Sequence, residues 1–455
     1  MIREKDEIVA RKEWCVMRMF DIITHKKNGK ALTEEEIRFF VKGFTLGEIP
    51  DYQVSSLLMA ICLKGMDENE TAILTDAMLR SGDMADLSSI PGIKVDKHST
   101  GGVGDKTSLI IGPIVAACGV PVAKMSGRGL GHSGGTIDKL ESIPGLKTEV
   151  DPEKFCDIVR STGIAIIGQS GDIAPADKKL YALRDVTATI DSIPLIASSI
   201  MSKKLAAGSD AILLDVKTGS GAFMKSLDDS IALAQAMVSI GVRSGRRVMA
   251  LVTDMDRPLG SAIGNALEVE EVVAVLRGGG PEDLVAVCLE LASYMLFLAG
   301  VAKTVEKCKE LAMDAVNSGN AFKKFKAMVA AQNGDVDALD NGFAKAAIIS
   351  SFKAVTAGYI SHMNAEDCGM ASLALGAGRV RKEDNIDYSA GIVLHKKTGD
   401  YVTAGETIAY LHTSDAGKLR EAEEILTDAI VISDTPTTAT KSVLAVVSEE
   451  GVRML

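Results

Sequence analysis

Residues 17–82 have a pattern of hydrophobic and polar positions that predicts a small domain made of helices. Thr33 is expected to cap one helix, because a carboxylate stands at the third helical position and apolar residues then recur with helical spacing. Two further helices are predicted over residues 55–64 and 69–80. The preceding residues 1–16 are highly charged and are expected to form an N-terminal extension.

Residues 90–175 and 209–340 change to short apolar runs that alternate with helical segments. This alternation predicts an α/β domain with a mainly parallel central sheet. The long helical pattern of residues 176–208 interrupts it and is expected to return to the small helical domain. The predicted strands are 93–96, 120–125, 164–168, 211–215 and 247–252, and the main predicted helices are 107–118, 136–140 and 226–243.

Residues 350–455 predict a C-terminal α+β domain. Between residues 388 and 402 we expect a hairpin of two strands joined by a turn at Gly399-Asp400, followed by a third strand over 404–411. The pattern is similar to the hairpins of lipoyl and biotinyl carriers, but the tripeptide around their modified lysine is missing. A structural role is therefore favoured over a carrier role.

The composition is that of a globular protein with more than one domain. At 455 residues the chain exceeds one ordinary core, so two or three domains are expected. A net charge of −11 and an aromatic content of 4% argue against a general nucleic-acid or membrane surface. The 7 dispersed cysteines favour free thiols in a reducing compartment. Because no signal core or membrane-spanning window is visible, a cytoplasmic location is predicted.

The first of two glycine-rich loops follows the strand predicted near residue 95 and spans residues 97–108. It fails the Walker A pattern, because Asp105 separates the last glycine from the lysine. Backbone N–H groups of a glycine run at a helix N-terminus nevertheless make an anion site, to which Lys97 adds charge and Ser99 and Ser108 add hydroxyl donors. The alternative is a tight turn with a solvated lysine.

The second loop spans residues 126–139 and contains a literal G-x-G-x-x-G pattern. A dinucleotide site is disfavoured, because the following helix is short and is interrupted by Pro144-Gly145. Arg128 and His132 within the loop suit a phosphate or a developing negative charge, although a simple turn is again the alternative. Two such loops indicate one anion held from two sides, and hence an enzyme that acts on phosphate or a phosphorylated substrate.

Two predicted helices carry polar side chains one turn apart, namely Tyr181 with Arg184 and Ser199 with Lys203. Without further context a solvated helix face would explain both pairs. A third glycine-rich loop, residues 215–223, also follows a strand. Three loops at the carboxyl ends of the strands predict a pocket there.

These segments together resemble the pyrimidine nucleoside phosphorylases. The resemblance is carried by the run from Val95 to Asp105, by the run from Ser126 to His132 and by residues 138–141, and it extends from about residue 17 to about residue 430. It implies reversible phosphorolysis of pyrimidine nucleosides such as uridine, thymidine and deoxyuridine to the free base and an α-pentose 1-phosphate. It also implies a homodimer whose two domains close over a cleft, with no organic cofactor.

The resemblance assigns roles by matching position. His98, Arg184 and Lys203 would be catalytic, with His98 near the base O2 and the other two on the departing base. The phosphate-binding residues would be Lys97, His98, Ser99, Ser108, Lys124, Met125, Ser126 and Thr136. The base-binding residues would be Tyr181, Arg184, Ser199 and Lys203.

Residues 122–126 and 181–186 look more like the broad-specificity branch of the family than the strict thymidine branch. That branch is similar to enzymes with a structural potassium site, and the matching positions are Gly104, Lys106, Leu259, Ala262 and Glu271. Lys106 stands where a threonine is common. The metal survives this departure if only the backbone carbonyl is a ligand, and not if a side-chain oxygen is needed. Ser108 also replaces a threonine but keeps the hydroxyl.

Two other functions compete with phosphorolysis. A phosphoribosyltransferase of the anthranilate type has a similar fold, but would need an Asp-Glu metal pair that is missing from Asp215-Val216-Lys217. A non-catalytic nucleoside-binding protein would keep the base site and lose the phosphate loop, which is intact here. Phosphorolysis with inorganic phosphate as co-substrate is therefore the favoured prediction.

Overall fold

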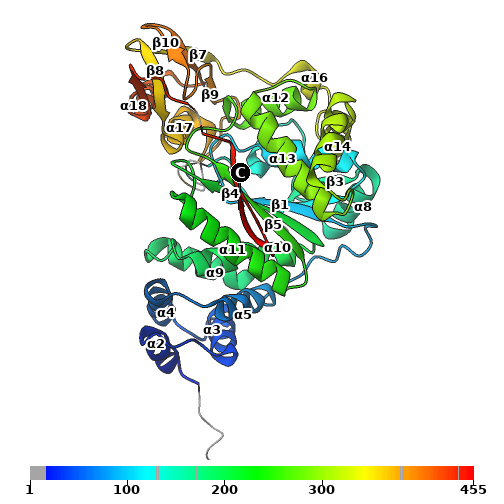
Figure 1. The fold of residues 1–455 in the computed structure, drawn as a ribbon, viewed down its shortest axis with the longest axis vertical. Coiled ribbons are helices and arrows are strands. Elements are labelled where there is room, and N and C mark those ends of the chain that lie inside the picture. The colour runs from blue at the N-terminus through cyan, green and yellow to red at the C-terminus, as the bar shows by residue number, and fades with distance from the viewer. Residues whose placement is uncertain are drawn as a thin grey trace, which may run out of the picture. The chain divides into compact units, whose positions relative to one another are not determined.

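The computed structural model describes residues 17–129, 131, 133–169, 172–379, 381, 384–438 and 440–455 (Figure 1). These residues form two compact units. The smaller unit contains residues 17–84 and 172–206, and the larger contains residues 85–169 and the described part of 207–455. The predicted extension, residues 1–16, lies outside the described residues.

The smaller unit consists of helices packed around an apolar core that includes Ile22, Ile37 and Leu57. Thr33 caps a helix as predicted: its side chain accepts a hydrogen bond from Glu36 N, and the Glu36 carboxylate accepts one from Thr33 N. The helices are α2 (Met19–Lys27), α3 (Glu34–Leu46), α4 (Asp51–Lys64), α5 (Glu68–Leu79), α9 (Pro175–Val186) and α10 (Ile193–Ala206). The structure thus confirms the predicted all-helical unit.

The continuous helical pattern of residues 176–208 is divided into α9 and α10 in the structure. Ala188 adopts a positive φ of 53° in the connection, a conformation that does not continue a helix. Pro194 then stands in the first turn of α10, where its missing N–H costs no helical hydrogen bond. Both helices belong to the smaller unit.

The larger unit contains a mixed five-stranded sheet and a separate two-stranded parallel sheet, which confirms the predicted α/β class, although the central sheet is only partly parallel. Strands β1 (Val95–Ser99), β4 (Ala211–Thr218) and β5 (Arg247–Asp254) are parallel neighbours, and β2 (Val122–Ser126) pairs in parallel with β3 (Ile164–Gly168). Every residue of β4 is buried. Burial on both faces explains why β3 and the first half of β4 appear in the sequence as apolar runs without alternation.

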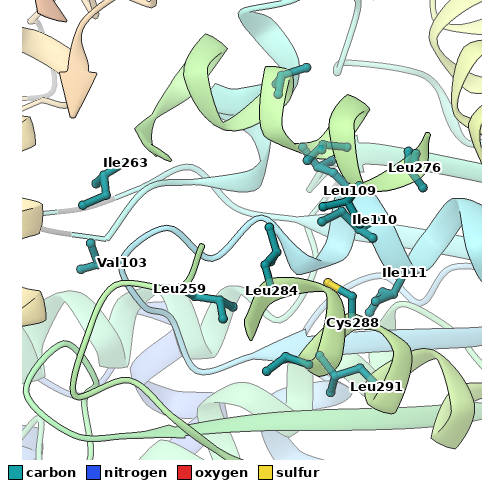
Figure 2. Close-up of a cluster of buried hydrophobic side chains, with 14 of the residues drawn as sticks. Val103, Leu109, Ile110, Ile111, Leu259, Ile263, Leu276, Leu284, Cys288 and Leu291 are labelled. Carbon is teal, nitrogen blue, oxygen red and sulfur yellow. The ribbon is translucent and has the colours of Figure 1, made fainter. Parts of the chain in front are cut away.

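Helices cover both faces of this sheet: α11 (Leu227–Arg243) lies on one face and α13 (Glu282–Leu298) on the other (Figure 1). Side chains of α6 (Thr107–Ala117), α12 (Asn265–Leu276) and α13 interlock in the core beside it (Figure 2). The other helices that the unit's described residues form before residue 345 are α7 (Thr136–Glu141), α8 (Pro152–Thr162), α14 (Val305–Asn317), α15 (Asn320–Ala331) and α16 (Ala338–Asn341).

The C-terminal segment forms two small antiparallel sheets, in the orders β6-β9-β11-β7 and β10-β8-β12. The strands are β6 (Ala262–Gly264), β7 (Ile348–Lys353), β8 (Gly358–Met363), β9 (Gly391–Leu394), β10 (Tyr401–Val402), β11 (Thr407–Thr413) and β12 (Ile430–Ser433). The helices are α17 (Ala365–Ser372), η1 (Leu373–Ala377), η2 (Ala416–Lys418) and α18 (Leu419–Ala429).

The hairpin predicted between residues 388 and 402 is wrong, because β9 and β10 belong to different sheets. The Gly399-Asp400 turn exchanges two backbone hydrogen bonds with a distant strand: Gly399 N donates to Ile360 O at 2.8 Å, and Ile360 N donates to Asp400 O at 2.9 Å. Strand β10 therefore pairs with β8.

The end of the chain also differs from the predicted C-terminal domain. Strand β13 (Val443–Ser448) pairs antiparallel with β5, and β14 (Gly451–Met454) pairs with β13. These two strands extend the central sheet. In the described ranges, no helix combines the length and apolar character that crossing a bilayer requires, and the six cysteines there have free thiols, as predicted.

Candidate active site

Lys97 lies within a buried network of charges in the larger unit. Its strand, β1, ends at Ser99, and the first loop leads from there to α6. The Lys97 side chain is 1% exposed, and its Nζ lies 2.6 Å from Thr107 Oγ1 and 2.8 Å from Asp215 Oδ2. Lys217 Nζ also lies 2.8 Å from that carboxylate oxygen. One carboxylate of β4 therefore pairs with ammonium groups from both β1 and β4.

Asp105 is the second buried carboxylate of this network. Ser99 Oγ donates to its Oδ2, and Thr107 Oγ1 donates to its Oδ1 at 2.6 Å. Burial alone would raise the pKa of Asp105, but the ammonium groups around it, Lys97 foremost, hold the pKa well below its usual range. The sequence pattern gave Asp105 no role beyond breaking the Walker A spacing. The sequence signal that could have identified Asp105 is an acidic residue between lysines in a glycine-rich loop.

Thr100 connects the first loop to the third. Thr100 N donates to Asp215 O at 3.1 Å, and Lys217 N donates to Thr100 Oγ1 at 2.9 Å. Thr253 Oγ1 holds the Asp215 carboxylate from β5 with a 2.6 Å hydrogen bond. Burial opposes the charged form of Lys217, but the neighbouring carboxylates, Asp215 foremost, outweigh burial and raise its pKa. The carboxyl ends of β1 and β4 thus share one network.

Two lysines tie the second loop and its flanking elements to the first loop. Lys139 of α7 is buried, and its Nζ donates to Asp105 O at 2.8 Å and lies 2.9 Å from Glu268 Oε2. Lys124 of β2 donates from Nζ to Lys97 O. The two loops are therefore joined within the larger unit, which is the arrangement that an anion held from two sides requires.

Close backbone packing explains two glycines of the second loop. A Cβ on Gly135 would lie 2.0 Å from Gly129 N, so neither segment tolerates a side chain there. Arg128, which the loop pattern favoured as an anion ligand, instead pairs with two acids of α7: its Nη1 lies 3.3 Å from Asp138 Oδ1 and 2.5 Å from Glu141 Oε2. Its guanidinium therefore braces the loop.

The remaining predicted phosphate-binding residues lie on elements that border the two loops. They are His98 on β1, Ser108 in the first turn of α6, Met125 and Ser126 at the end of β2, and Thr136 at the start of α7. Ser108 is 8% exposed. His132 of the second loop lies outside the described residues.

The four predicted base-binding residues all lie in the smaller unit. The buried Arg184 guanidinium closes the connection between α9 and α10: it donates to Thr189 O at 3.1 Å, Ile190 O at 2.7 Å and Leu195 O at 3.1 Å. Its Cζ lies 5.9 Å from the centre of the Tyr181 ring. Burial lowers the pKa of Arg184 and raises that of Tyr181.

Lys203 is fixed between two partners in the same unit. Its Nζ donates to Ser199 Oγ at 3.0 Å on its own helix and to the Asp177 carboxylate on α9. Asp177 is 3% exposed, whereas the Lys203 side chain is 26% exposed. The helix spacing predicted the pairing of Ser199 with Lys203. It gave no indication of Asp177, whose only sequence signal is an acid one helix turn before Tyr181.

The residues matched to a potassium site come together around an ammonium group instead. Lys106 Nζ donates to Leu259 O at 3.2 Å, to Ala262 O at 2.9 Å and to the Glu271 carboxylate. The Lys106 backbone N–H donates to Gly104 O at 3.0 Å. A side-chain cation of the chain itself therefore occupies the space among these oxygens, and the residues do not fit an added metal ion.

Three sequence families match consecutive parts of the chain. "Glycosyl transferase family, helical bundle domain" matches residues 20–82, "Glycosyl transferase family, a/b domain" matches residues 92–322, and "Pyrimidine nucleoside phosphorylase C-terminal domain" matches residues 359–433. The first corresponds to helices of the smaller unit. The second covers much of the larger unit and also includes residues 172–206 of the smaller unit, and the third lies in the larger unit.

Similar proteins cover nearly the whole chain. A pyrimidine-nucleoside phosphorylase of Geobacillus stearothermophilus is 55% identical over 425 residues, which are 93% of this chain and 98% of that protein. One from Staphylococcus haemolyticus is 56% identical over 426 residues, again 93% and 98% of the two chains. Anthranilate phosphoribosyltransferase of Thermus thermophilus shares the fold, with a TM-score of 0.53 and 21% identity over 69% of this chain and 99% of that chain.

Proposed function

Because the chain belongs to the pyrimidine-nucleoside phosphorylase family, and is therefore a pentosyltransferase, we propose that it catalyses the reversible phosphorolysis of uridine, deoxyuridine and thymidine. The products are the free base and an α-pentose 1-phosphate. The observation that carries the proposal is the union of the first and second loops, in which Lys139 and Lys124 bind the backbone at Asp105 and Lys97.

Inorganic phosphate is the proposed nucleophile, and its site lies in the larger unit. Backbone N–H groups at the start of α6 and the hydroxyls of Ser99, Ser108, Ser126 and Thr136 supply neutral donors. Ser99 donates to Asp105 in this structure, so binding phosphate requires its hydroxyl to turn from the carboxylate to the ligand. Lys97 pairs with Asp215, so its buried charge is not left unpaired. Its ammonium can use its remaining N–H donor capacity to bind the anion.

The pyrimidine base is the proposed ligand of α9 and α10 in the smaller unit. Tyr181, a residue that is 39% exposed, offers an aromatic ring, and Lys203 offers an ammonium already fixed by Asp177 and Ser199. Three of the five N–H groups of Arg184 donate to backbone carbonyls, which leaves two that can donate to the base. A side chain that is already ordered loses little entropy when it binds.

The proposed reaction breaks the glycosidic bond as a phosphate oxygen attacks the anomeric carbon, with positive charge developing on the sugar. The departing base gains negative charge, which Arg184 and Lys203 stabilise as fixed donors. His98 assists departure near the base O2. Phosphate and nucleoside must be held together with water excluded, because water would otherwise compete as the nucleophile.

The test is phosphate-dependent release of free base from uridine, deoxyuridine, thymidine and cytidine. We expect release from the first three with phosphate and none without it. Lys203→Met should abolish most of the release, whereas Lys178→Met on the exposed side of the same helix pair should leave it intact. Release from thymidine and deoxyuridine alone would place the chain in the strict thymidine branch. Phosphate-independent release, or no release from any nucleoside, would overturn the proposal.

Homodimer assembly and a cytoplasmic location stay predictions from the family resemblance and the composition. Light scattering on the purified chain tests the first, with a mass of twice 47.9 kDa expected. A monomeric mass at concentrations where the enzyme is active would contradict it.

A further inference from the structure

Lys106 is buried in the turn that begins α6, with 1% of its surface exposed. Its ammonium has three N–H donors, and the structure gives it three oxygen acceptors: Leu259 O at 3.2 Å, Ala262 O at 2.9 Å and the Glu271 carboxylate. Glu271 is itself held in place, because it accepts a 2.9 Å hydrogen bond from Ser261 N. The ammonium therefore has a complete set of partners.

The backbone around this ammonium leaves no room for a second cation. A Cβ on Gly260 would lie 2.4 Å from Glu271 Oε2 and 3.0 Å from Lys106 Nζ. A Cβ on Gly104 would lie 2.5 Å from Leu259 O. Both glycines have positive φ, 71° and 70°, so the two turns approach each other as closely as their backbones allow.

The charges nearby also disfavour another cation. Lys397 Nζ donates to Gly260 O at 2.9 Å and to Asp283 Oδ2 at 2.5 Å, immediately behind the Lys106 site. Burial lowers the pKa of Lys397, and the positive charge of Lys106 adds to that effect. Two ammonium groups already share this corner with two carboxylates, so an added monovalent ion would face repulsion without a free counter-charge.

From this geometry we infer that the Lys106 ammonium is a built-in substitute for a bound potassium ion. Both carry one positive charge and are held by backbone carbonyls and a carboxylate. Lys106 joins the first loop to the 259–262 turn and to α12. Figure 2 shows Val103, Leu259 and Ile263 from these segments in the same view of the core. Because the cation is covalently attached, its occupancy does not depend on salt, and the enzyme should be indifferent to potassium.

The first measurement is the thermal midpoint of the wild-type chain in potassium chloride and in tetramethylammonium chloride, at equal ionic strength. Tetramethylammonium screens charge but is too large for a carbonyl-lined site. We expect the two midpoints to agree within about 2 °C at every salt concentration. In a chain of this size, a difference of that size between the two salts would already indicate a significant stabilising effect of one of them. No substrate is needed, so this outcome is independent of the proposed reaction.

The second measurement restores the metal site. Lys106→Thr removes the ammonium and offers a hydroxyl oxygen in the space it leaves, so we expect a midpoint below wild type that rises saturably with potassium and not with tetramethylammonium. Lys106→Met is the matched control, because its unbranched side chain, one atom shorter than that of lysine, fills most of the space without charge. Its midpoint should fall in both salts and respond to neither.

Two results would overturn the inference. One is a wild-type midpoint that rises saturably with potassium but not with tetramethylammonium, because the site would then still bind the ion. The other is a Lys106→Thr chain that gains no stability from potassium, whether or not the variant is folded before potassium is added. The oxygens around position 106 would then not form a cation site at all. A variant that folds only when potassium is present supports the inference.

Discussion

Lys97 Nζ lies 2.8 Å from Asp215 Oδ2, and the two side chains are 1% and 0% exposed. Lys217 Nζ lies at the same distance from that oxygen. A single carboxylate thus pairs with two buried ammonium groups, and Asp105 provides the second negative charge that balances them. Charges in such surroundings are stable only when they are paired, so the network fixes the ends of β1 and β4 relative to each other.

Asp215→Asn should therefore destabilise the protein strongly, because it keeps the shape of the side chain and removes the charge between two ammonium groups. Removing one partner of a buried pair costs about 3–5 kcal/mol. Urea unfolding followed by circular dichroism measures the loss. Asp428→Asn, at an exposed position of α18, is the control and should change stability by no more than about 0.5 kcal/mol. Equal, small effects of both substitutions would show that the network is not a stabilising one.

Asp105 should make the stability of the protein sensitive to acid. Its folded pKa lies well below the usual carboxyl range. Its stabilising effect is therefore fully present above the unfolded pKa of about 3.9 and is lost as the pH falls through the folded value. We expect Asp105→Asn to lower the urea midpoint at pH 6, and the difference from wild type to shrink as the pH falls below about 4.

Urea midpoints from pH 6 to pH 3 measure this pH dependence. The exposed Asp428→Asn variant should stay close to wild type throughout. A difference between Asp105→Asn and wild type that grows toward acid would mean that the folded pKa is raised.

Local features of the fold were predictable from the sequence, and pairings over long distances were not. The Thr33 cap depends on residues within one turn, and the structure has it. The Gly399-Asp400 turn has hairpin chemistry, yet two of its backbone hydrogen bonds join it to Ile360, about forty positions earlier. A turn sequence favours reversal of the chain, but tertiary pairing decides which strand lies beside it.

The candidate site divides in the same way. In the sequence, the first glycine-rich loop indicated a role for Lys97, and helix spacing indicated one for Lys203. Their carboxylate partners, Asp215 and Asp177, were not assigned to them, because each pair forms between two different elements. The position of Lys106 was noticed as a departure from the family. Only the fold shows where its long side chain ends, at carbonyls more than 150 residues away in sequence.

Ser108 should affect the binding of phosphate and leave the binding of nucleoside unchanged. It lies in the first turn of α6 and is nearly buried. A hydrogen bond to a charged ligand contributes about 1.5–3 kcal/mol, so Ser108→Ala should raise the KM for phosphate about 10- to 150-fold. Initial rates at varied phosphate and saturating uridine measure this effect.

Ser108→Thr keeps the hydroxyl and is the matched control, with a KM for phosphate within about threefold of wild type, or less than about 0.7 kcal/mol. The KM for uridine should be unchanged in both variants. An equal rise for alanine and threonine would assign the effect to packing around α6 and would remove Ser108 from the phosphate site.

Arg184 should contribute to the departure of the base beyond its structural role in the α9–α10 connection. Losing one fixed donor to a developing negative charge costs about 2.7–4 kcal/mol in the barrier, so Arg184→Ala should lower kcat about 10²- to 10³-fold. The same substitution leaves three carbonyls without their donor, so the thermal midpoint should also fall.

Thr187→Ala separates the effect on catalysis from the effect on stability, because Thr187 Oγ1 bonds within the same connection and Arg184 stays in place. If Thr187→Ala lowers kcat as much as Arg184→Ala does at a temperature where both are folded, Arg184 acts only by holding the connection. A loss of kcat confined to Arg184→Ala, with the KM for phosphate unchanged, is the result we expect from a donor that acts on the base itself.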